Sequence, residues 1–187
     1  MKKFYTFCVV LGCMAPFSAS AQDVPKPDVV VPQAESRLLG MLRSIDEVFT
    51  ASQLEAAHPN AKAFLKARVQ DSSEQLYVRK RALTLLSNYK DAETLVFLES
   101  AQTLDQEELR AMAVYTIGVN WGVDDPERAF AAARDGVKDS SLYVREWSVR
   151  ALGWNVSKRA EELLKELRSN AELNKLVERS ERRRKGL

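Results

Sequence analysis

The sequence has few of the residues on which enzymes most often rely for chemistry. Its 187 residues include one histidine, His58, and two cysteines, Cys8 and Cys13. A zinc site usually takes four nitrogen or sulfur ligands, which this sequence can hardly supply. His58 stands beside Pro59 at an expected helix break, so a Ser–His–Asp arrangement has weak support. We therefore expect a protein that is not an enzyme and has no catalytic residues, no metal and no cofactor.

Signatures of phosphate, calcium and nucleic-acid binding are also missing. The glycines, seven in all, are scattered along the chain, so no glycine-rich loop is placed to hold a phosphate. No acidic segment has the spacing of a calcium loop. Positive and negative charges nearly balance, with 28 lysines and arginines against 26 aspartates and glutamates. This balance gives no global electrostatic reason to expect binding to nucleic acid.

Residues 1–21 have the three parts of a secretory signal peptide. Lys2 and Lys3 precede a largely apolar stretch at residues 4–17, and small residues at 19–21 form a cleavage site. The apolar stretch is shorter than the roughly 20 residues that a membrane-spanning helix needs. Cleavage would remove both cysteines and the two lysines that give the full chain its excess of positive charge. We predict an exported protein, most simply one of a bacterial periplasm.

A second processing site overlaps this leader. Residues 10–13, ending in Cys13, resemble the site at which bacterial lipoproteins are cut. Lipid on Cys13 would anchor the protein to a membrane. Leu11 fits such a site poorly, and a cut there would leave a very short apolar segment. We favour cleavage after residue 21 and keep the lipid anchor as the alternative.

The rest of the chain is predicted to be all-α, because no segment alternates apolar and polar residues with period 2. Residues 22–32 hold three prolines and form a predicted linker. A helix is expected from Gln33, with Leu38, Leu42, Ile45 and Phe49 on one face, and Ser52 and Glu55 have capping-box spacing. Further helices are expected at residues 61–69, 74–88, 92–102, 107–119, 126–136, 142–155, 158–167 and 171–179. Asp91 is an expected N-cap, Pro126 an expected first helical residue and Gly136 an expected helix end.

One ten-residue pattern occurs three times, at residues 78–87, 109–118 and 144–153. Each copy has an arginine in its second position and a small residue in its fifth, which are Arg79 and Ala82, Arg110 and Ala113, and Arg145 and Ser148. The arginines are 31 and 35 residues apart. A period in this range is typical of proteins built from stacked repeats. In the third copy the helical period predicts a core face of Val144, Ser148, Ala151 and Leu152. The small fifth residue would let a neighbouring helix approach closely.

This pattern resembles that of HEAT repeat proteins. The resemblance covers residues 71–167, where an aspartate precedes each arginine and Asp125-Pro126-Glu127 begins a second helix. It implies a right-handed α-solenoid of about four antiparallel helix pairs over residues 33–178, followed by a basic tail at 179–187. It also implies a ladder of ion pairs between neighbouring repeats, with these members: Arg79, Asp105, Arg110, Asp139 and Arg145.

A second helical face in the C-terminal half gathers aromatic residues. Tyr143, Trp147, Arg150 and Trp154 follow one another at steps of four, three and four residues, which places them on one side of a helix. Tyrosine, tryptophan and arginine are the residues that dominate interface hot spots. Together with Trp121, these four are the predicted partner-binding residues. The alternative is that they pack against the adjoining repeat or the last helix.

The sequence therefore favours a non-catalytic scaffold or adaptor for protein–protein interaction, one variant of which inhibits a partner enzyme by covering its site. The partner is an unidentified protein, and neither nucleic acid nor metal is expected. A second hypothesis is an adaptor at the membrane surface or cell wall, held by lipid on Cys13 or by the basic run Arg182–Lys185. A third is a lyase-type enzyme, since some HEAT-like proteins act in bilin pigment assembly, although export argues against that role.

Overall fold

The computed structural model of the protein describes residues 33–44 and 47–186. The predicted signal peptide, the linker, Cys13 and Ile45 lie outside these residues. Within them the chain is all-α, with ten α-helices, one short 3₁₀ helix and no strand. The helices are α1 (Gln33–Arg43), α2 (Ala51–Ala57), α3 (Ala61–Gln70), α4 (Leu76–Leu85), η1 (Leu86–Asn88), α5 (Ala92–Ala101), α6 (Glu107–Trp121), α7 (Pro126–Gly136), α8 (Leu142–Leu152), α9 (Lys158–Leu167) and α10 (Asn174–Arg184).

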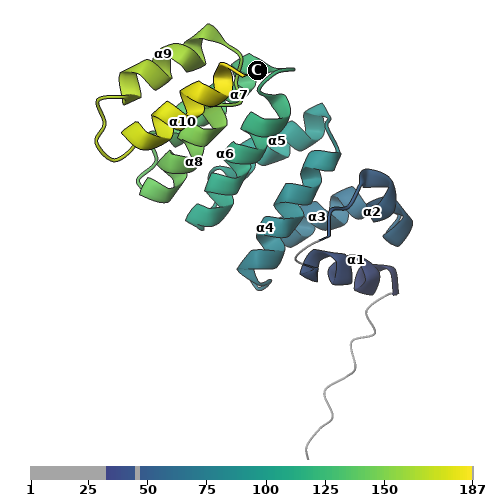
Figure 1. The fold of residues 1–187 in the computed structure, drawn as a ribbon. Coiled ribbons are helices and arrows are strands. Elements are labelled where there is room, and N and C mark those ends of the chain that lie inside the picture. The colour runs from purple at the N-terminus through teal and green to yellow at the C-terminus, as the bar shows by residue number, and fades with distance from the viewer. Residues whose placement is uncertain (1–32, 45–46, 187) are drawn as a thin grey trace, which may run out of the picture. The chain divides into compact units, whose positions relative to one another are not determined.

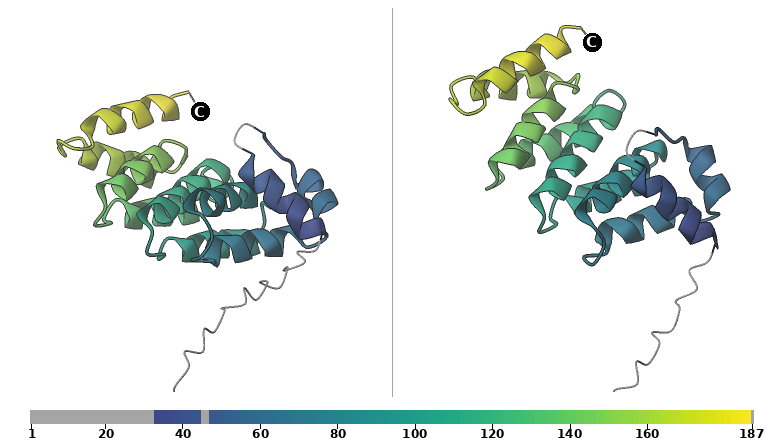
Figure 2. Two further views of the ribbon diagram at one scale, coloured as in Figure 1. Left: turned by 90° about the horizontal axis from the view of Figure 1, so that it is seen from below. Right: turned by 60° about the horizontal axis from the view of Figure 1, so that its bottom comes forward.

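The helices pack against their near neighbours in the sequence. Within residues 61–184, α3 packs on α4, α5 on α6, α7 on α8 and α9 on α10. Helices two apart also pack, and α4, α6, α8 and α10 lie side by side in that order (Figures 1 and 2). The other helices of these pairs, α3, α5, α7 and α9, lie beside that row. The three copies of the arginine pattern fall on α4, α6 and α8, and therefore on neighbouring helices.

The predicted core face of the pattern is confirmed. Val144, Ser148, Ala151 and Leu152 on α8 are each at most 1% exposed. The equivalent positions of the earlier copies are buried as well, namely Val78, Ala82, Leu85, Leu86, Leu109, Ala113, Thr116 and Ile117. The helical period thus locates the side of each helix that the next pair covers.

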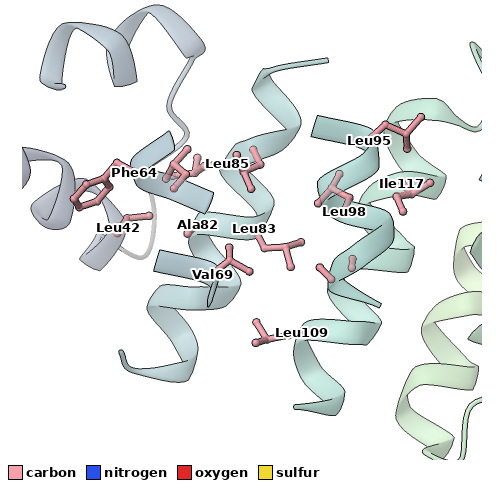
Figure 3. Close-up of a cluster of buried hydrophobic side chains, with 14 of the residues drawn as sticks. Leu42, Phe64, Val69, Ala82, Leu83, Leu85, Leu95, Leu98, Leu109 and Ile117 are labelled. Carbon is pink, nitrogen blue, oxygen red and sulfur yellow. The ribbon is translucent and has the colours of Figure 1, made fainter. Parts of the chain in front are cut away.

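Two clusters of buried side chains form the core. The first draws on α1 to α7, and Figure 3 shows Leu83 of α4 reaching toward Leu98 of α5 and Leu109 of α6. The second draws on α6 to α10 and includes Phe130 and Val177. Burying a leucine side chain of this kind is worth roughly 1.5–3 kcal/mol. Apolar contact between successive helices is therefore the main source of stability.

Several helix starts agree with the sequence, and one does not. Asp91 caps α5 by accepting a hydrogen bond from the Thr94 amide at 2.8 Å, and Pro126 is the first residue of α7. The capping box predicted at Ser52 and Glu55 is wrong, because the structure forms it two residues earlier. There Thr50 Oγ1 accepts from the Gln53 amide, and Gln53 Oε1 accepts from the Thr50 amide at 2.8 Å. Ser52 and Glu55 thus lie inside α2.

Other helix ends also differ from the predictions. Leu38 and Leu42 are buried on α1, but this helix ends at Arg43, so Phe49 lies outside it. α8 ends at Leu152 rather than at residue 155, and α10 spans Asn174–Arg184 rather than residues 171–179. The burial of Val177 and Ser180 holds α10 on its neighbours beyond the predicted end. The boundary drawn before the basic tail, at residue 179, therefore falls inside a helix.

The glycines described below allow neighbouring helices to approach closely rather than allowing the chain to turn. No glycine among the described residues has a positive φ. α7 does end at Gly136, as predicted, but a Cβ there would overlap the Ser148 hydroxyl of α8. At Gly118 of α6 an added Cβ would stand 2.6 Å from the Ala151 Cβ and 2.8 Å from the Ala151 Cα. The backbones of α6 and α8 can approach this closely only without a side chain at residue 118.

This contact predicts opposite effects for the same substitution in two helices. Gly118→Ala should lower the free energy of unfolding by about 1–3 kcal/mol, because the methyl group meets backbone that cannot move away cheaply. Gly40→Ala is the matched control, since a Cβ at that position of α1 meets no atom within 4 Å. It should raise stability by about 0.5–1 kcal/mol through helix propensity. Urea unfolding followed by circular dichroism measures both, and equal changes would contradict the close contact.

Candidate functional site

A well-buried ion pair between neighbouring helix pairs joins Arg110 of α6 to Asp139, just ahead of α8. Arg110 Nε donates to Asp139 Oδ2 at 2.8 Å and Nη2 donates to Oδ1 at 2.9 Å. Both side chains are 16% exposed. Arg110 Nη1 also donates to the main-chain carbonyls of Leu104 and Asp105, each at 2.9 Å. One guanidinium thereby fixes two connecting loops.

The electrostatics of this pair follow from its geometry. The hydrogen bonds from Arg110 hold the pKa of Asp139 below its ordinary value of 3.8, although partial burial acts in the other direction. Asp139 also accepts from the Ser141 amide at 2.8 Å, which favours the ionised carboxylate further. The same hydrogen bonds raise the pKa of Arg110. Folding therefore favours the charged form of both groups.

The other predicted members of the ladder are placed differently. Arg145 pairs with Glu172 at 3.0 Å instead of with an aspartate, and its Nη1 donates to the Asp139 and Ser140 carbonyls. Arg79 is 7% exposed and its Nε donates to the Val69 carbonyl at 2.9 Å. In the described part of the chain no ion pair joins Arg79 to Asp105. The structure thus brings Arg110 and Asp139 together and leaves Arg79 bonded to backbone.

A second series of ion pairs, which the sequence analysis missed, links α3, α5, α7 and α9. Lys62 of α3 contacts Asp91 and Glu93 at the start of α5, and its hydrogen bond lowers the pKa of Asp91 to about 2. The next links join Glu99 to Arg128 at 2.6 Å and Glu127 to Arg159 at 2.8 Å. Partners in these links are 29–32 residues apart in the sequence. This offset is close to the first arginine spacing, 31 residues, and was the available signal.

Trp147 of α8 is the centre of the predicted aromatic face. Its ring meets the Tyr115 ring of α6 nearly edge-on, with centroids 4.8 Å apart, and the Tyr143 ring at 6.0 Å. The Arg150 guanidinium lies 4.5 Å from the centroid of the Trp147 ring. All four side chains are partly exposed. Tyr143, Trp147 and Arg150 therefore share one surface, to which Tyr115 also belongs.

The other two tryptophans have different surroundings. Trp121 is 5% exposed and belongs to the hydrophobic core, where the end of α6 packs on the neighbouring helices. It does not join the predicted partner-binding residues at the surface. Trp154 is partly covered by Arg183 of α10, whose guanidinium lies 4.6 Å from a Trp154 ring centroid. This end of the predicted aromatic face is therefore partly covered by the last helix, which is the alternative left open above.

A hollow opens where α6, α8 and α10 meet, and we call it the arginine–aromatic groove. Its volume is about 350 Å³, and it is lined by Tyr115, Trp147, Arg150, Leu176, Arg179, Ser180 and Arg183. No lining residue is acidic. Two of the seven belong to the predicted partner-binding set, Trp147 and Arg150. The predicted last helix, at residues 171–179, includes Leu176 and Arg179 but ends before Ser180 and Arg183. Sequence reasoning missed all four because no local pattern shows which surface the last helix packs on.

His58 has a local structural setting. Its Nδ1 accepts a hydrogen bond from the Asn60 amide at 3.0 Å in the turn after α2, and its ring packs at 5.3 Å on that of Phe64. Across residues 33–44 and 47–186 we find no group of three histidine, cysteine or acidic side chains suited to hold a metal. In the same residues no helix is both long and apolar enough to cross a membrane.

The sequence matches no protein-family model and no curated protein at a significant level. Functional inference therefore depends on the geometry of the two ion-pair series and of the groove.

The Arg110–Asp139 pair predicts a specific loss of stability. Asp139→Asn should lower the free energy of unfolding by about 1–3 kcal/mol at neutral pH, because it removes a charged and largely buried acceptor. Since the pKa of Asp139 is lowered by folding, its stabilisation is complete above the pKa of the unfolded carboxyl group. It is lost as pH falls through the lower folded value. The difference between wild type and variant should therefore be constant from about pH 5 to 8 and shrink below about pH 4.

The next link along the chain is the control for this experiment. Glu172→Gln breaks the pair with Arg145, in which the glutamate side chain is 58% exposed. Exposed pairs of this kind contribute less than about 1 kcal/mol. Urea unfolding at several pH values compares the two variants. Equal losses, or a difference that persists at low pH, would contradict the role given to Asp139.

Proposed function

We propose that the chain is an exported, HEAT-like, right-handed α-solenoid that acts as a non-catalytic protein–protein interaction module in a bacterial periplasm. Two sets of observations support this proposal. One is the regular offset of the contacts between helix pairs, and the other is the aromatic and basic surface centred on Trp147. An inhibitor that covers a partner enzyme's site is one form of this function.

The solenoid is supported by interactions that recur one unit apart. Beside the ion pairs already described, Ser180 Oγ donates to the Val149 carbonyl and Asn155 Nδ2 donates to the Pro126 carbonyl, 31 and 29 residues away. Each pair of helices therefore contacts mainly the pair before it and the pair after it. In a repeat array such nearest-neighbour contacts supply most of the stability.

The single observation that carries the binding function is the surface formed by Tyr115, Tyr143, Trp147 and Arg150. These side chains come from two helices, α6 and α8, and hold each other by ring contact and by the guanidinium over Trp147. Aromatic and arginine side chains are the commonest interface hot spots. A surface fixed in this way loses little conformational freedom on binding, so more of the contact energy appears as affinity.

The membrane-surface adaptor is the second candidate, because the basic run at Arg182–Lys185 would favour anionic lipid. In the structure part of this run is engaged. Arg184 Nη2 donates to the Ser157 carbonyl at 3.0 Å, and burial lowers the pKa of Arg184. Arg182, Arg183 and Lys185 stay exposed. We place protein binding ahead of lipid binding because contact with anionic lipid would not use the aromatic surface around Trp147.

Partner capture tests the proposed function. The chain without residues 1–21 is immobilised, an envelope extract from the source organism is passed over it, and retained proteins are identified by mass spectrometry. The retained protein is then purified and its affinity measured by calorimetry. Trp147→Leu should weaken binding at least tenfold, as expected for a hot-spot residue that contributes about 1.4 kcal/mol or more.

Val96→Ser is the matched control for this substitution. Val96 is an apolar residue of α5 that is 56% exposed and lies far from α8 in the sequence. It should leave the affinity unchanged, while circular dichroism verifies that both variants remain folded. Loss of binding with Val96→Ser alone would place the contact elsewhere. Retention of no protein by the wild-type chain would contradict the proposed function.

A further inference from the structure

We propose that the arginine–aromatic groove binds an acidic peptide segment of the partner protein. The inference rests on the proposed interaction function and specifies the chemistry of the partner at this place. Carboxylates of the segment would pair with Arg150, Arg179 and Arg183, while an apolar side chain covers Trp147 and Leu176.

One side of α10 both attaches this helix and lines the groove. Val177 and Ser180 are buried, and Ser180 Oγ donates to the Val149 carbonyl of α8 at 2.8 Å. A Cβ at Gly153 would lie 3.0 Å from the Ser180 Cβ, so the two helices approach closely here. Arg179 and Arg183 are four positions apart and therefore lie on one side of the helix, and both line the groove beside Ser180.

The charge in the groove is of one sign. Three guanidinium groups line it, and neither Arg179 nor Arg183 has a carboxylate within ion-pair distance among the described residues. Arg150 forms an ion pair with Glu146 of the same helix at 3.9 Å, which is longer than a hydrogen bond, and Glu146 does not line the groove. Gathering like charges costs energy unless a ligand of opposite sign enters. An anionic occupant therefore complements this groove.

Two of the three guanidinium groups are already oriented. Arg150 lies over the Trp147 ring at 4.5 Å and Arg183 over a Trp154 ring at 4.6 Å. Such contact occupies the face of the planar group and leaves its N–H edges available for a carboxylate. These side chains are therefore partly ordered already in the free protein, so they lose less conformational entropy when a ligand binds.

The form of the groove favours a peptide over other anions. Its volume of about 350 Å³ is near the lower end of the range of about 300–1,000 Å³ for ligand sites, which suits a short segment. Its recessed aromatic and leucine surface would stay unused on a flat membrane. Nucleic acid would need phosphate contacts along a wide basic surface, whereas this chain carries 28 basic and 26 acidic residues.

The test uses a synthetic hexapeptide in which glutamate and leucine alternate, and a second in which glutamine replaces each glutamate. Each is titrated into the ¹⁵N-labelled chain without residues 1–21, and the indole N–H signals of Trp147 and Trp154 are followed by NMR. We expect the glutamate peptide to shift both signals, with an affinity that falls as salt is raised from about 50 to about 500 mM. We expect no shift with the glutamine peptide.

Substitutions locate the binding site. Arg179→Gln/Arg183→Gln should weaken binding of the glutamate peptide at least tenfold. Arg179→Gln alone, at an exposed position, should weaken it severalfold and leaves the contact of Arg183 with Trp154 in place. Arg182→Gln is the matched control, because it removes the same charge from an exposed residue of α10 that does not line the groove. It should change the affinity less than twofold.

The outcomes separate this inference from the proposed function. Equal binding of both peptides, or equal loss with Arg182→Gln and Arg179→Gln, would overturn the inference. Binding to vesicles of anionic lipid that depends on Arg179 and Arg183, without peptide binding, would assign the groove to lipid instead. If the captured partner is held equally by wild type and by Arg179→Gln/Arg183→Gln, the inference fails and the interaction module stands.

Discussion

Close contact between successive helices is the constraint on which the rest of this structure depends. Where α6 meets α8, and where α8 meets α10, the facing residues are Gly118 with Ala151 and Gly153 with Ser180. Larger side chains would overlap the facing helix and force the two backbones apart. The bond from Ser180 to the Val149 carbonyl and the bidentate link of Arg110 to the next loop join helix pairs held at this spacing. Small residues thus set the distance that the polar links require.

The fold was predictable from the sequence wherever a helix carries a repeated local pattern. The arginine motif located α4, α6 and α8 and their buried faces, because helical period and burial act within ten residues. Helix ends were less predictable. α10 continues to Arg184 because Val177 and Ser180 are held by α8, a contact between residues about 30 positions apart. The start of α2 depends on whether Thr50 or Ser52 accepts the hydrogen bond from a backbone amide of the first helical turn. Threonine and serine both suit the N-cap position.

The candidate site was predictable only in part. Periodicity placed Tyr143, Trp147 and Arg150 on one side of α8, and the structure brings them together. It could not show that Trp121 lies in the core or that Arg183 covers Trp154, because both facts depend on how other helices pack. The ion pairs between α3, α5, α7 and α9 join long charged side chains, which produce no periodic pattern of apolar residues in the sequence. Only their common offset along the chain marks them.

Binding in the groove and the stability of the last helix are coupled. α10 supplies Arg179 and Arg183 to the groove, and in the described chain it packs mainly on α8 and α9, with no helix on its far side. Terminal elements with few neighbours open at lower free energy than the centre of an array. When α10 leaves α8, the groove loses two of its three guanidinium groups, so the apparent affinity scales with the docked fraction. A ligand that bridges Arg150 of α8 and Arg179 of α10 must therefore stabilise the docked position of α10. By linkage, the free energy that the ligand adds to docking equals the free energy that docking adds to binding of the ligand.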